Sequence, residues 1–439
     1  MSYEDRTIVE LDRLTQTRFG DYVIVDRLGS GGMGTVDLAV HAPPGGGIER
    51  PVAIKRLHTH LTKDEQLVRM FLDEARIAAR ICHPHVCRLL DAGCIDGVWY
   101  FTLDLLFGAV LSDVIAHLRT RSDPAINAQW PAVLTRVIVD ACEGMHAAHE
   151  LADEDGELLQ VIHRDISPEN LFVGFDGAVR VIDFGIASAH SRYHETATGE
   201  LRGKVAYVAP ERLVTVEDVD RRVDVWGLGV VLWEGLTLRP LFRQKDALAT
   251  LSSIRSGEVP NLRELRPDVP ERVARVAHKA LSLDRNERFE TARDMGVELA
   301  AAAAEAGWHA DLAEVSEWMN RLLPDAQRRQ RRVAELVTAV KRDERLLGDD
   351  LHEIHTTGTR TNPAMKREPN TADVTTAPTV GPQVPPEVPT KLHPGLLAPG
   401  LGPAMLDAPR LSWPIMIALI AGAGFVGFLV AAIVLIIVF

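Results

Sequence analysis

The stretch HRDISPENLFVGFDGAVRVIDFG, residues 163–185, decides the fold of this chain. Its runs LFVG and VRVID are short, apolar and β-rich, and they flank the turn residues Asp176-Gly177. This pattern predicts a β-hairpin. The hairpin would bring Asp165 and Asn170, which precede its first strand, into one cleft with Asp183, which ends its second. Two carboxylates and an amide there supply oxygen atoms of the kind that phosphoryl transfer needs.

In order and spacing, the stretch resembles the catalytic loop and the DFG motif of protein kinases. HRD or DFG alone is a weak signal, but the two at this separation are a strong one. The resemblance implies that Asp165 accepts a proton from the attacking hydroxyl. It also implies that Asn170 and Asp183 hold Mg²⁺, or Mn²⁺ in its place, against the phosphates of ATP.

Length, charge and cysteine content limit the class of protein. The 439 residues give room for a two-lobed domain with attachments. The net charge of −13 argues against nucleic acid as the main partner, because phosphate-backbone binding needs a basic face. The four cysteines are too few for a disulfide framework in so long a chain and indicate a reducing compartment.

Strand patterns begin at Phe19, where YVIVDRLG, TVDLAV and PVAIKRL are separated by glycines and prolines. The motif Gly29-Ser-Gly31-Gly-Met-Gly34 lies between the first two, and glycines there would let the backbone approach phosphates. Further on, Lys55 lies in an apolar strand, where it needs an anionic partner. The predicted partners are the α/β-phosphates and Glu74 on the following helix. The alternative is a surface lysine and a glutamate on a helix face.

After one more predicted strand, the sequence pattern becomes helical. The run VWYFTLDLLFG, residues 98–108, predicts a buried strand that leads into a connector, and helical periodicity follows it. After the DFG motif comes a polar segment that Ala209-Pro-Glu211 closes, and Asp224-Val-Trp226-Gly-Leu-Gly229 opens an apolar helix. Arg288 is the expected partner of Glu211, because a buried carboxylate needs a cation.

Two patterns imitate binding motifs. Cys82-His83-Pro-His85-Val-Cys87 lacks the spacing of paired metal ligands, and we interpret it as a turn after the helix. Gly422-Ala-Gly424-Phe-Val-Gly427 matches a glycine-rich nucleotide motif, but no strand precedes it. We interpret its small residues as a surface at which two apolar helices can approach closely.

The glycine motif, VAIK, the helix glutamate, HRD with its asparagine, DFG, APE, DxWxxG and the late arginine follow one another in kinase order across residues 20–300. The chain therefore resembles the Hanks-type Ser/Thr protein kinases, in particular bacterial ones with a membrane anchor. The resemblance implies an α+β fold in which a β-rich small lobe lies over a helical large lobe, with ATP between them. The expected parts are an N-terminal tail (1–17), a kinase domain (18–300, with lobes 18–106 and 107–300), a helical extension (301–348), a Pro/Thr-rich linker (349–412) and a transmembrane helix (413–439).

The resemblance also assigns roles to single residues. Lys55 would pair with Glu74 and with the α/β-phosphates, Leu103 would be the gatekeeper, and Asp104 would begin the hinge that contacts adenine. The nucleotide pocket that it implies consists of Leu28, Gly29, Ser30, Gly31, Gly32, Met33, Gly34, Val36, Ala53, Lys55, Leu103 and Asp104. The structural positions that it implies are Arg164, Glu211, Asp224 and Arg288.

Two positions depart from the family pattern. Ser167 stands where the pattern HRDxKPxN has a lysine, and Lys204 stands where a threonine commonly precedes APE. The two positions touch in the kinase fold, so we hypothesise a reciprocal exchange in which Lys204 supplies the charge to the γ-phosphate and Ser167 the hydroxyl. The alternative is a weakened enzyme. The missing lysine also weakens the Ser/Thr assignment, because it is one of the usual markers.

The arginine before the catalytic aspartate, Arg164, needs an anion in the active state. Phosphorylation between DFG and APE would supply one through charge-assisted hydrogen bonds. Thr196 and Thr198 are the candidate sites, filled by autophosphorylation between the molecules of a homodimer. The alternative is an ordinary polar loop.

The C-terminal part predicts a membrane anchor. Ile415–Phe439 is a run of about 25 uncharged residues, long enough for one tilted crossing, with Trp413 at its boundary. Lys391 and Arg410 precede the run, so the positive-inside rule places the kinase domain in the cytoplasm. We expect a single-pass, tail-anchored protein of the cell inner membrane without an extracytoplasmic sensor. The extension 301–348 either packs on the large lobe or forms a helix pair that binds a partner.

Three functions compete. The favoured one is a membrane-tethered enzyme that transfers the γ-phosphate of ATP to Ser/Thr hydroxyls of proteins. A pseudokinase scaffold would bind nucleotide without efficient transfer, and the complete polar set argues against it. A small-molecule phosphotransferase is disfavoured by the APE segment and the Asp224 helix, which build a peptide-docking platform. The polar set comprises Lys55, Glu74, Asp165, Asn170 and Asp183.

Overall fold

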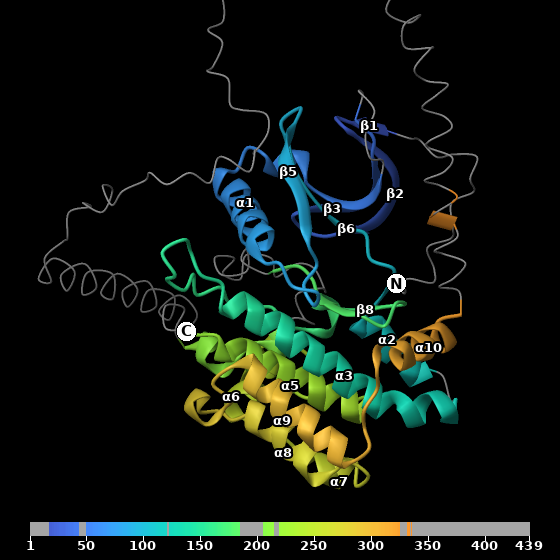
Figure 1. Cartoon of the computed structure of the whole chain (residues 1–439). Helices are drawn as coiled ribbons and strands as arrows, with labels where there is room; N and C mark the ends of the chain where they lie inside the picture. The colour runs from blue at the N-terminus through green and yellow to red at the C-terminus, as the bar shows by residue number, and fades with distance from the viewer. Residues whose placement is uncertain are drawn as a thin grey trace, which may run out of the picture. The chain divides into compact units, whose positions relative to one another are not determined.

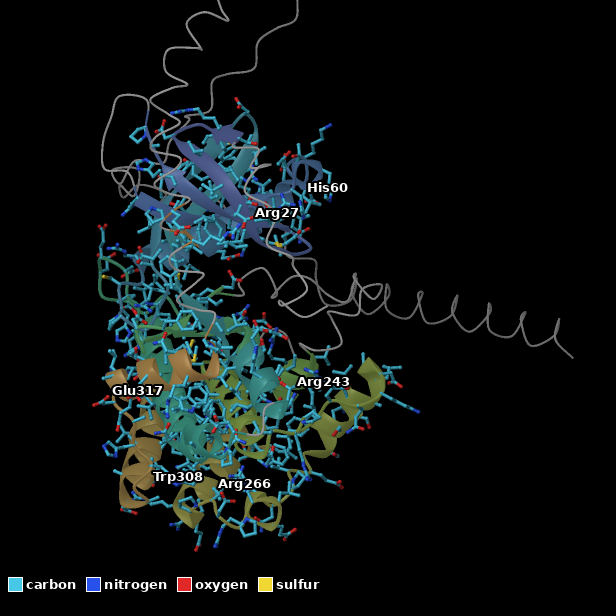
Figure 2. All side chains as sticks on the ribbon, turned by 90° about the vertical axis from the view of Figure 1, so that its right-hand side faces the viewer. Arg27, His60, Arg243, Arg266, Trp308 and Glu317 are labelled. Carbon is cyan, nitrogen blue, oxygen red and sulfur yellow. The ribbon has the colours of Figure 1, made fainter. Side chains whose placement is uncertain are left out.

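A small β-rich lobe and a larger helical lobe make up the described part of the chain (Figure 1). The computed structural model describes residues 17–43, 50–120, 123–184, 205–214, 219–324, 332, 333 and 335. Within these ranges the two-lobed, kinase-like fold predicted from the sequence is confirmed. Figure 2 places Arg27 and His60 in the small lobe, and Arg243, Arg266, Trp308 and Glu317 in the large one.

The small lobe is a six-stranded antiparallel sheet in the order β1-β2-β3-β4-β6-β5. Its strands are β1 (Thr17–Phe19), β2 (Tyr22–Ser30), β3 (Gly34–His41), β4 (Arg50–Leu57), β5 (Leu89–Ile95) and β6 (Val98–Asp104). The glycine motif forms the turn between β2 and β3. Gly34 must be glycine, because a Cβ there would lie 2.1 Å from the carbonyl oxygen of Arg56 on β4. The close approach joins the base of the glycine loop to the strand that carries Lys55.

One helix, α1 (Glu65–Arg80), completes the small lobe beside β5 (Figure 1). It begins at Asp64, whose side chain accepts hydrogen bonds from the backbone N–H groups of Gln66 and Leu67, an N-cap that satisfies two otherwise unpaired donors. Its buried face contributes Phe71 and Ala75 to a cluster with Leu57 of β4 and Phe101 of β6. This packing fixes the helix that carries Glu74 against the strand that carries Lys55.

The large lobe is built around α5, whose residues are almost all buried. A helix that is apolar on every side belongs in the centre of a domain. Its close approach to the catalytic loop requires Gly227, since a Cβ there would lie 2.8 Å from Cβ of Ile166. The elements of this lobe are β7 (Gly108–Val110), α2 (Leu111–Thr120), α3 (Pro124–His149), β8 (Leu171–Gly174), β9 (Val179–Val181), α5 (Arg222–Thr237), α6 (Ala247–Ser256), α7 (Leu262–Leu265), α8 (Glu271–Ala280), α9 (Ala292–Glu305) and α10 (Leu312–Leu322).

The hairpin predicted around Asp176-Gly177 is present as β8 and β9, which pair with β7 in a three-stranded sheet. Gly177 has a φ of 82°, the left-handed conformation that such a turn needs and that glycine adopts without a steric penalty. The short 3₁₀ helix Pro168–Asn170 leads directly into β8. The hairpin therefore connects the catalytic loop to the DFG segment, as the sequence indicated.

Between residues 301 and 324 the chain packs on the large lobe. Residue 300, the expected end of the kinase domain, lies inside α9. The next helix, α10, is fixed by Trp318, whose ring stacks on Trp130 with 5.4 Å between centroids and whose Nε1 donates to the carbonyl oxygen of Ile126 at 2.9 Å. Both indoles are buried. For Leu312–Leu322, the packed arrangement is the one observed.

Some of the segments and residues singled out in the sequence fall outside the described residues: most of the tail, the linker 349–412, the apolar run 413–439, Lys204, Thr196 and Thr198. Among the helices that the structure describes, none is both long and apolar enough to cross a bilayer.

Candidate active site

A lysine near the end of β4 joins the two lobes. Lys55 Nζ lies 2.7 Å from Glu74 Oε1 on α1 and 3.2 Å from Asp183 Oδ1, which follows β9. The predicted pairing of Lys55 with Glu74 is thus confirmed, and Asp183 is a second partner from the other lobe. The Asp183 side chain remains 46% exposed, whereas that of Lys55 is only 18% exposed.

The two carboxylates hold Lys55 in its charged form. Burial lowers the pKa of the Lys55 ammonium, but the neighbouring carboxylates of Asp183 and Glu74 raise it, and the net pKa lies above the usual lysine range. The side chain is therefore cationic at every physiological pH. A buried, permanently charged ammonium beside a half-exposed carboxylate is suited to bind a phosphate group.

The catalytic loop places Asp165 and Asn170 together. The amide nitrogen of Asn170 donates to the backbone oxygen of Asp165 at 2.7 Å and to its Oδ2 at 3.1 Å. These hydrogen bonds orient both side chains and leave the amide oxygen of Asn170 as its acceptor atom. Ile182 N donates to the Asn170 backbone oxygen at 3.0 Å. The loop is thus joined to the segment that carries Asp183.

The phenylalanine of the DFG motif is packed inward. Phe184 is buried, and its ring lies 4.8 Å from that of His163. Arg164 and Asp183 both adopt left-handed backbone conformations, with φ values of 66° and 52°. Such conformations cost about 1–3 kcal/mol each in non-glycine residues and persist where surrounding contacts hold them. Here the inward packing of Phe184 holds the adjacent Asp183 at the cleft.

A buried aspartate of α5 holds the catalytic loop from below. Asp224 accepts hydrogen bonds from the backbone N–H groups of His163 and Arg164 at 2.9 and 2.8 Å. Burial alone would raise the pKa of Asp224, but the hydrogen bond and charge of His149 lower it, and the net pKa lies below the ordinary value. His149 Nε2 lies 2.9 Å from Asp224 Oδ2. No sequence pattern had singled out His149, which contacts a residue 75 positions away.

The glycine loop and the expected walls of the nucleotide pocket lie above this site. A Cβ at Gly29 or Gly31 would meet no atom of the described residues within 4 Å, so both glycines border open space. His58 Nε2 lies 3.0 Å from the carbonyl oxygen of Gly31, and its backbone N–H donates to Met33. No sequence pattern indicated this contact, which ties the loop to the end of β4. The pairings Val36–Lys55 and Ala53–Leu103 set the wall residues on adjacent strands.

At the end of β6, Asp104 marks the start of the connector between the lobes. Its backbone N–H donates to the carbonyl oxygen of Arg88 at 3.0 Å, and its carboxylate pairs with the Arg88 guanidinium at 3.3 Å. Phe107, further along the connector, accepts a hydrogen bond from Phe175 N at 2.8 Å. The connector is thus held from both lobes.

The predicted partnership of Arg288 and Glu211 is confirmed. The Arg288 guanidinium donates to both carboxylate oxygens of Glu211 at 2.7 and 2.8 Å, and it lies 4.9 Å from the ring centroid of Trp226. The pair fixes the APE segment, Ala209–Glu211, to the end of the large lobe. A bidentate, buried pair gives geometric specificity as well as energy.

Of the two residues that depart from the family pattern, Ser167 lies among the described residues and Lys204 does not. Ser167 is fully buried, and its hydroxyl donates to Glu169 Oε2 at a long 3.4 Å. Its expected exchange partner, Lys204, lies outside the described residues, so the exchange stays a hypothesis. Arg164 Nε is buried and has no hydrogen-bond partner among the described residues. A buried donor of this kind favours an anionic partner.

The residues present fit a magnesium-bound nucleotide. Asp183 offers a half-exposed carboxylate and Asn170 an amide oxygen, and oxygen atoms are the ligands that Mg²⁺ prefers. Lys55, held by Glu74, adds a cation for the phosphates. Two lobes joined by this ion-pair chain, above a loop that holds an aspartate and an asparagine together, define a nucleotide site of the protein kinase type.

The chain belongs to the protein kinase domain family, since the model of that family matches residues 22–297. It is similar to the tyrosine-protein kinase MasK of Myxococcus xanthus, with 42% identity over 275 residues, which cover 62% of this chain and 42% of that protein. It is also similar to the serine/threonine-protein kinase PrkC of Bacillus subtilis, with 31% identity over 287 residues, or 64% and 40% of the two chains. The chain thus spans less than half the length of these curated relatives.

Among solved structures, the kinase domain of Mycobacterium tuberculosis PknI matches with 25% sequence identity and a TM-score of 0.49. The match covers 66% of this chain and 98% of that one.

Proposed function

We propose that this chain is an ATP-dependent protein kinase that phosphorylates hydroxyl groups of protein substrates. The observation that carries the proposal is the position of Lys55 Nζ between Glu74 of the small lobe and Asp183 of the large lobe. Lys55 can contact both carboxylates only when the two lobes lie next to each other. The phosphates of a nucleotide bound there would contact residues of both lobes. Bound ATP and Mg²⁺ supply the transferable phosphoryl group and the charge that neutralises it.

The side chains of this chain provide positioning and charge. Lys55 binds the α/β-phosphates, and Asn170 and Asp183 hold the metal. Asp165 orients the acceptor hydroxyl and takes its proton, while the Asn170 amide fixes the Asp165 carboxylate. Because little covalent chemistry falls to the protein, alignment of the acceptor with the phosphoryl group contributes much of the rate.

Lys204 is proposed to replace the charge that the family pattern places at position 167. Loss of one such stabilising donor raises a barrier by roughly 3–4 kcal/mol, on the scale of an oxyanion-hole donor. The buried Ser167 hydroxyl cannot supply a positive charge itself. An active enzyme therefore needs a cation from elsewhere, and Lys204 is the residue that the sequence offers.

Serine and threonine hydroxyls are the proposed acceptors, and tyrosine is the second candidate. The name of PrkC, a serine/threonine-protein kinase, supports the first. The second is favoured by the absent lysine at Ser167 and by the similarity to MasK, which is named a tyrosine-protein kinase. Acid hydrolysis of the phosphorylated protein and separation of its phosphoamino acids distinguishes them: phosphoserine and phosphothreonine support the first, and phosphotyrosine alone overturns it.

Regulation is proposed to act through autophosphorylation at Thr196 or Thr198 between the molecules of a homodimer. The buried Nε of Arg164, which has no partner among the described residues, supports a phosphate as its ligand. Phosphate mapping of active protein tests this step, and an unmodified segment between DFG and APE would exclude it.

The proposed location is the cell inner membrane, with the apolar run 413–439 as a single span and the kinase domain in the cytoplasm. The length and apolar character of that run support a span, and Lys391 and Arg410 support the orientation. Membrane fractionation of cells that express the full chain, with and without residues 413–439, tests the anchor. Recovery of both forms in the soluble fraction would refute it.

Transfer of labelled γ-phosphate by the full-length chain tests the function. Wild type with Mg²⁺ is expected to label itself or a general protein substrate, and Asp165→Asn is expected to lower the rate at least about a hundredfold. Asp176→Asn is the matched control, since it makes the same change at the exposed hairpin turn. Wild type that binds nucleotide without transfer would instead identify a pseudokinase scaffold.

A further inference from the structure

Helix α10 rests on the turn of the hairpin that joins the catalytic loop to Asp183. A Cβ at Gly177 would lie 1.9 Å from the carbonyl oxygen of Leu312, so helix and turn are in direct backbone contact. Ser316 Oγ donates to the carbonyl oxygen of Phe175 at 2.7 Å. Figure 1 shows α10 beside β8, at the edge of the large lobe.

The same residue of the hairpin also holds the connector between the lobes. The backbone N–H of Phe175 donates to the carbonyl oxygen of Phe107 at 2.8 Å. Phe175 therefore hydrogen-bonds to α10 through its carbonyl and to the connector through its amide. A shift of α10 would be transmitted to the connector through a single buried residue.

Further along the chain, Val333 contacts the small lobe. It packs against the apolar cluster of Val23 and Val25 on β2, Leu38 and Val40 on β3, and Ala42, which follows β3. Leu28 and Leu105 pack on the same cluster. Leu28 is an expected wall of the nucleotide pocket, and Leu105 belongs to the connector. Val333 therefore packs on the same small-lobe cluster as one residue of the pocket and one residue of the connector.

We propose that α10 and Val333 form a brace that holds both lobes in the arrangement that binds nucleotide. The inference rests on the proposed function, because it assigns a positioning role toward the same site. Val333 follows Pro324 by a stretch that can span at most about 30 Å. Since α10 is fixed by Trp318, Val333 is presented to the small lobe at a high effective concentration, and a small contact suffices to hold it.

Val333 acts on nucleotide binding and not on the transfer step. In the proposed binding mode, Leu28 is a wall of the nucleotide pocket and Leu105 lies in the connector that contacts adenine, at the opposite end of the nucleotide from the acceptor hydroxyl. Loss of the Val333 contact should weaken nucleotide binding by about threefold. The upper limit is about fivefold, which applies if the whole free energy of the Val333 contact contributes to nucleotide binding. The KM for ATP should rise by this factor while kcat stays unchanged.

Calorimetric titration of the full-length chain with Mg·ADP tests the brace without requiring turnover. Val333→Asp is expected to raise the Kd about three- to fivefold, Val333→Ser about twofold, and Val333→Ile not at all. Glu335→Ala, an exposed neighbour, is the control and should leave the Kd unchanged. Should Val333→Asp fail to fold, Val333→Ser decides the question.

Two results would overturn the proposal in distinguishable ways. If wild type binds Mg·ADP and the Val333 variants bind it equally well, Val333 does not brace the lobes and the kinase proposal is unaffected. If wild type does not bind Mg·ADP at all, the nucleotide site itself is refuted. Ser316→Ala tests the other end: it should speed hydrogen exchange of the Phe175 amide and raise the KM for ATP, and unchanged values of both would remove α10 from the brace.

Discussion

Replacement of Arg288 by alanine should destabilise the large lobe far more than the loss of an exposed charge does. The Arg288 side chain is fully buried, and it makes two hydrogen bonds to Glu211, whose side chain is only 16% exposed. It also donates to the carbonyl oxygens of Ser282 at 2.8 Å and Arg222 at 3.1 Å, and it lies over the ring of Trp226.

The magnitude follows from what remains after the substitution. Glu211 would lose its bidentate partner in a largely buried place, and the carbonyl groups would lose their donor. Breaking one side of a buried pair costs about 3–5 kcal/mol, a large share of a typical folding free energy of about 5–15 kcal/mol. Arg288→Lys keeps the charge but not the planar fork, so an intermediate loss is expected.

Urea denaturation followed by tryptophan fluorescence measures the loss, since Trp226 lies at the pair. Arg263→Ala is the control, because the Arg263 side chain is 47% exposed and its pair with Glu271 is long, at 3.8 Å. An exposed pair contributes about 0–1 kcal/mol. A loss below about 1 kcal/mol for Arg288→Ala, similar to the control, would show that the buried pair does not hold the APE segment.

Four further predictions concern the site and its support. Lys55→Met should lower phosphate transfer at least about a hundredfold in a rate assay with the fold intact by circular dichroism. Lys204→Ala should lower turnover by about two orders of magnitude if the exchange hypothesis holds, and near-normal turnover would defeat it. Iodoacetamide should label the exposed Cys82 well before the buried Cys87, because burial raises the pKa of the Cys87 thiol to about 12; mass spectrometry reads the order. Trp318→Ala should cost about 3–5 kcal/mol of unfolding free energy, since it empties a buried stacked site.

Each of these predictions has its own contrary result. Transfer at the wild-type rate by Lys55→Met would remove the lysine from catalysis. Equal labelling of the two cysteines would mean that the small lobe opens readily. A loss below about 1 kcal/mol for Trp318→Ala would mean that α10 is held by other contacts, since a buried indole ordinarily contributes more.

The sequence predicted the parts of the site whose signals are local. The hairpin was predictable because Asp176-Gly177 and its flanking apolar runs specify a tight turn on their own. The pairs Lys55–Glu74 and Arg288–Glu211 were predictable because a buried charge needs a counter-charge and the family resemblance limited the choice. The match of residues 22–297 to the protein kinase domain family confirms that resemblance at the level of the family.

The contacts that the sequence did not predict join segments that are far apart along the chain. His149 lies in a helix whose periodicity marks it only as a buried position, and its partner is 75 residues away. The hydrogen bond from Ser316 to Phe175 crosses 141 residues. Neither pattern differs from ordinary helix packing until the chain is folded, so tertiary structure alone reveals how α10 supports the hairpin.

We propose that Lys55, Asp165 and Asp183 converge on one magnesium-bound nucleotide. Calorimetric titration with ADP, in the presence and absence of Mg²⁺, tests it directly in wild type, Asp183→Asn and the control Asp176→Asn. Wild type and the control should bind ADP more tightly with Mg²⁺, and Asp183→Asn should lose that difference. An Asp183→Asn variant that keeps the full Mg²⁺ dependence would show that Asp183 does not hold the metal at the nucleotide.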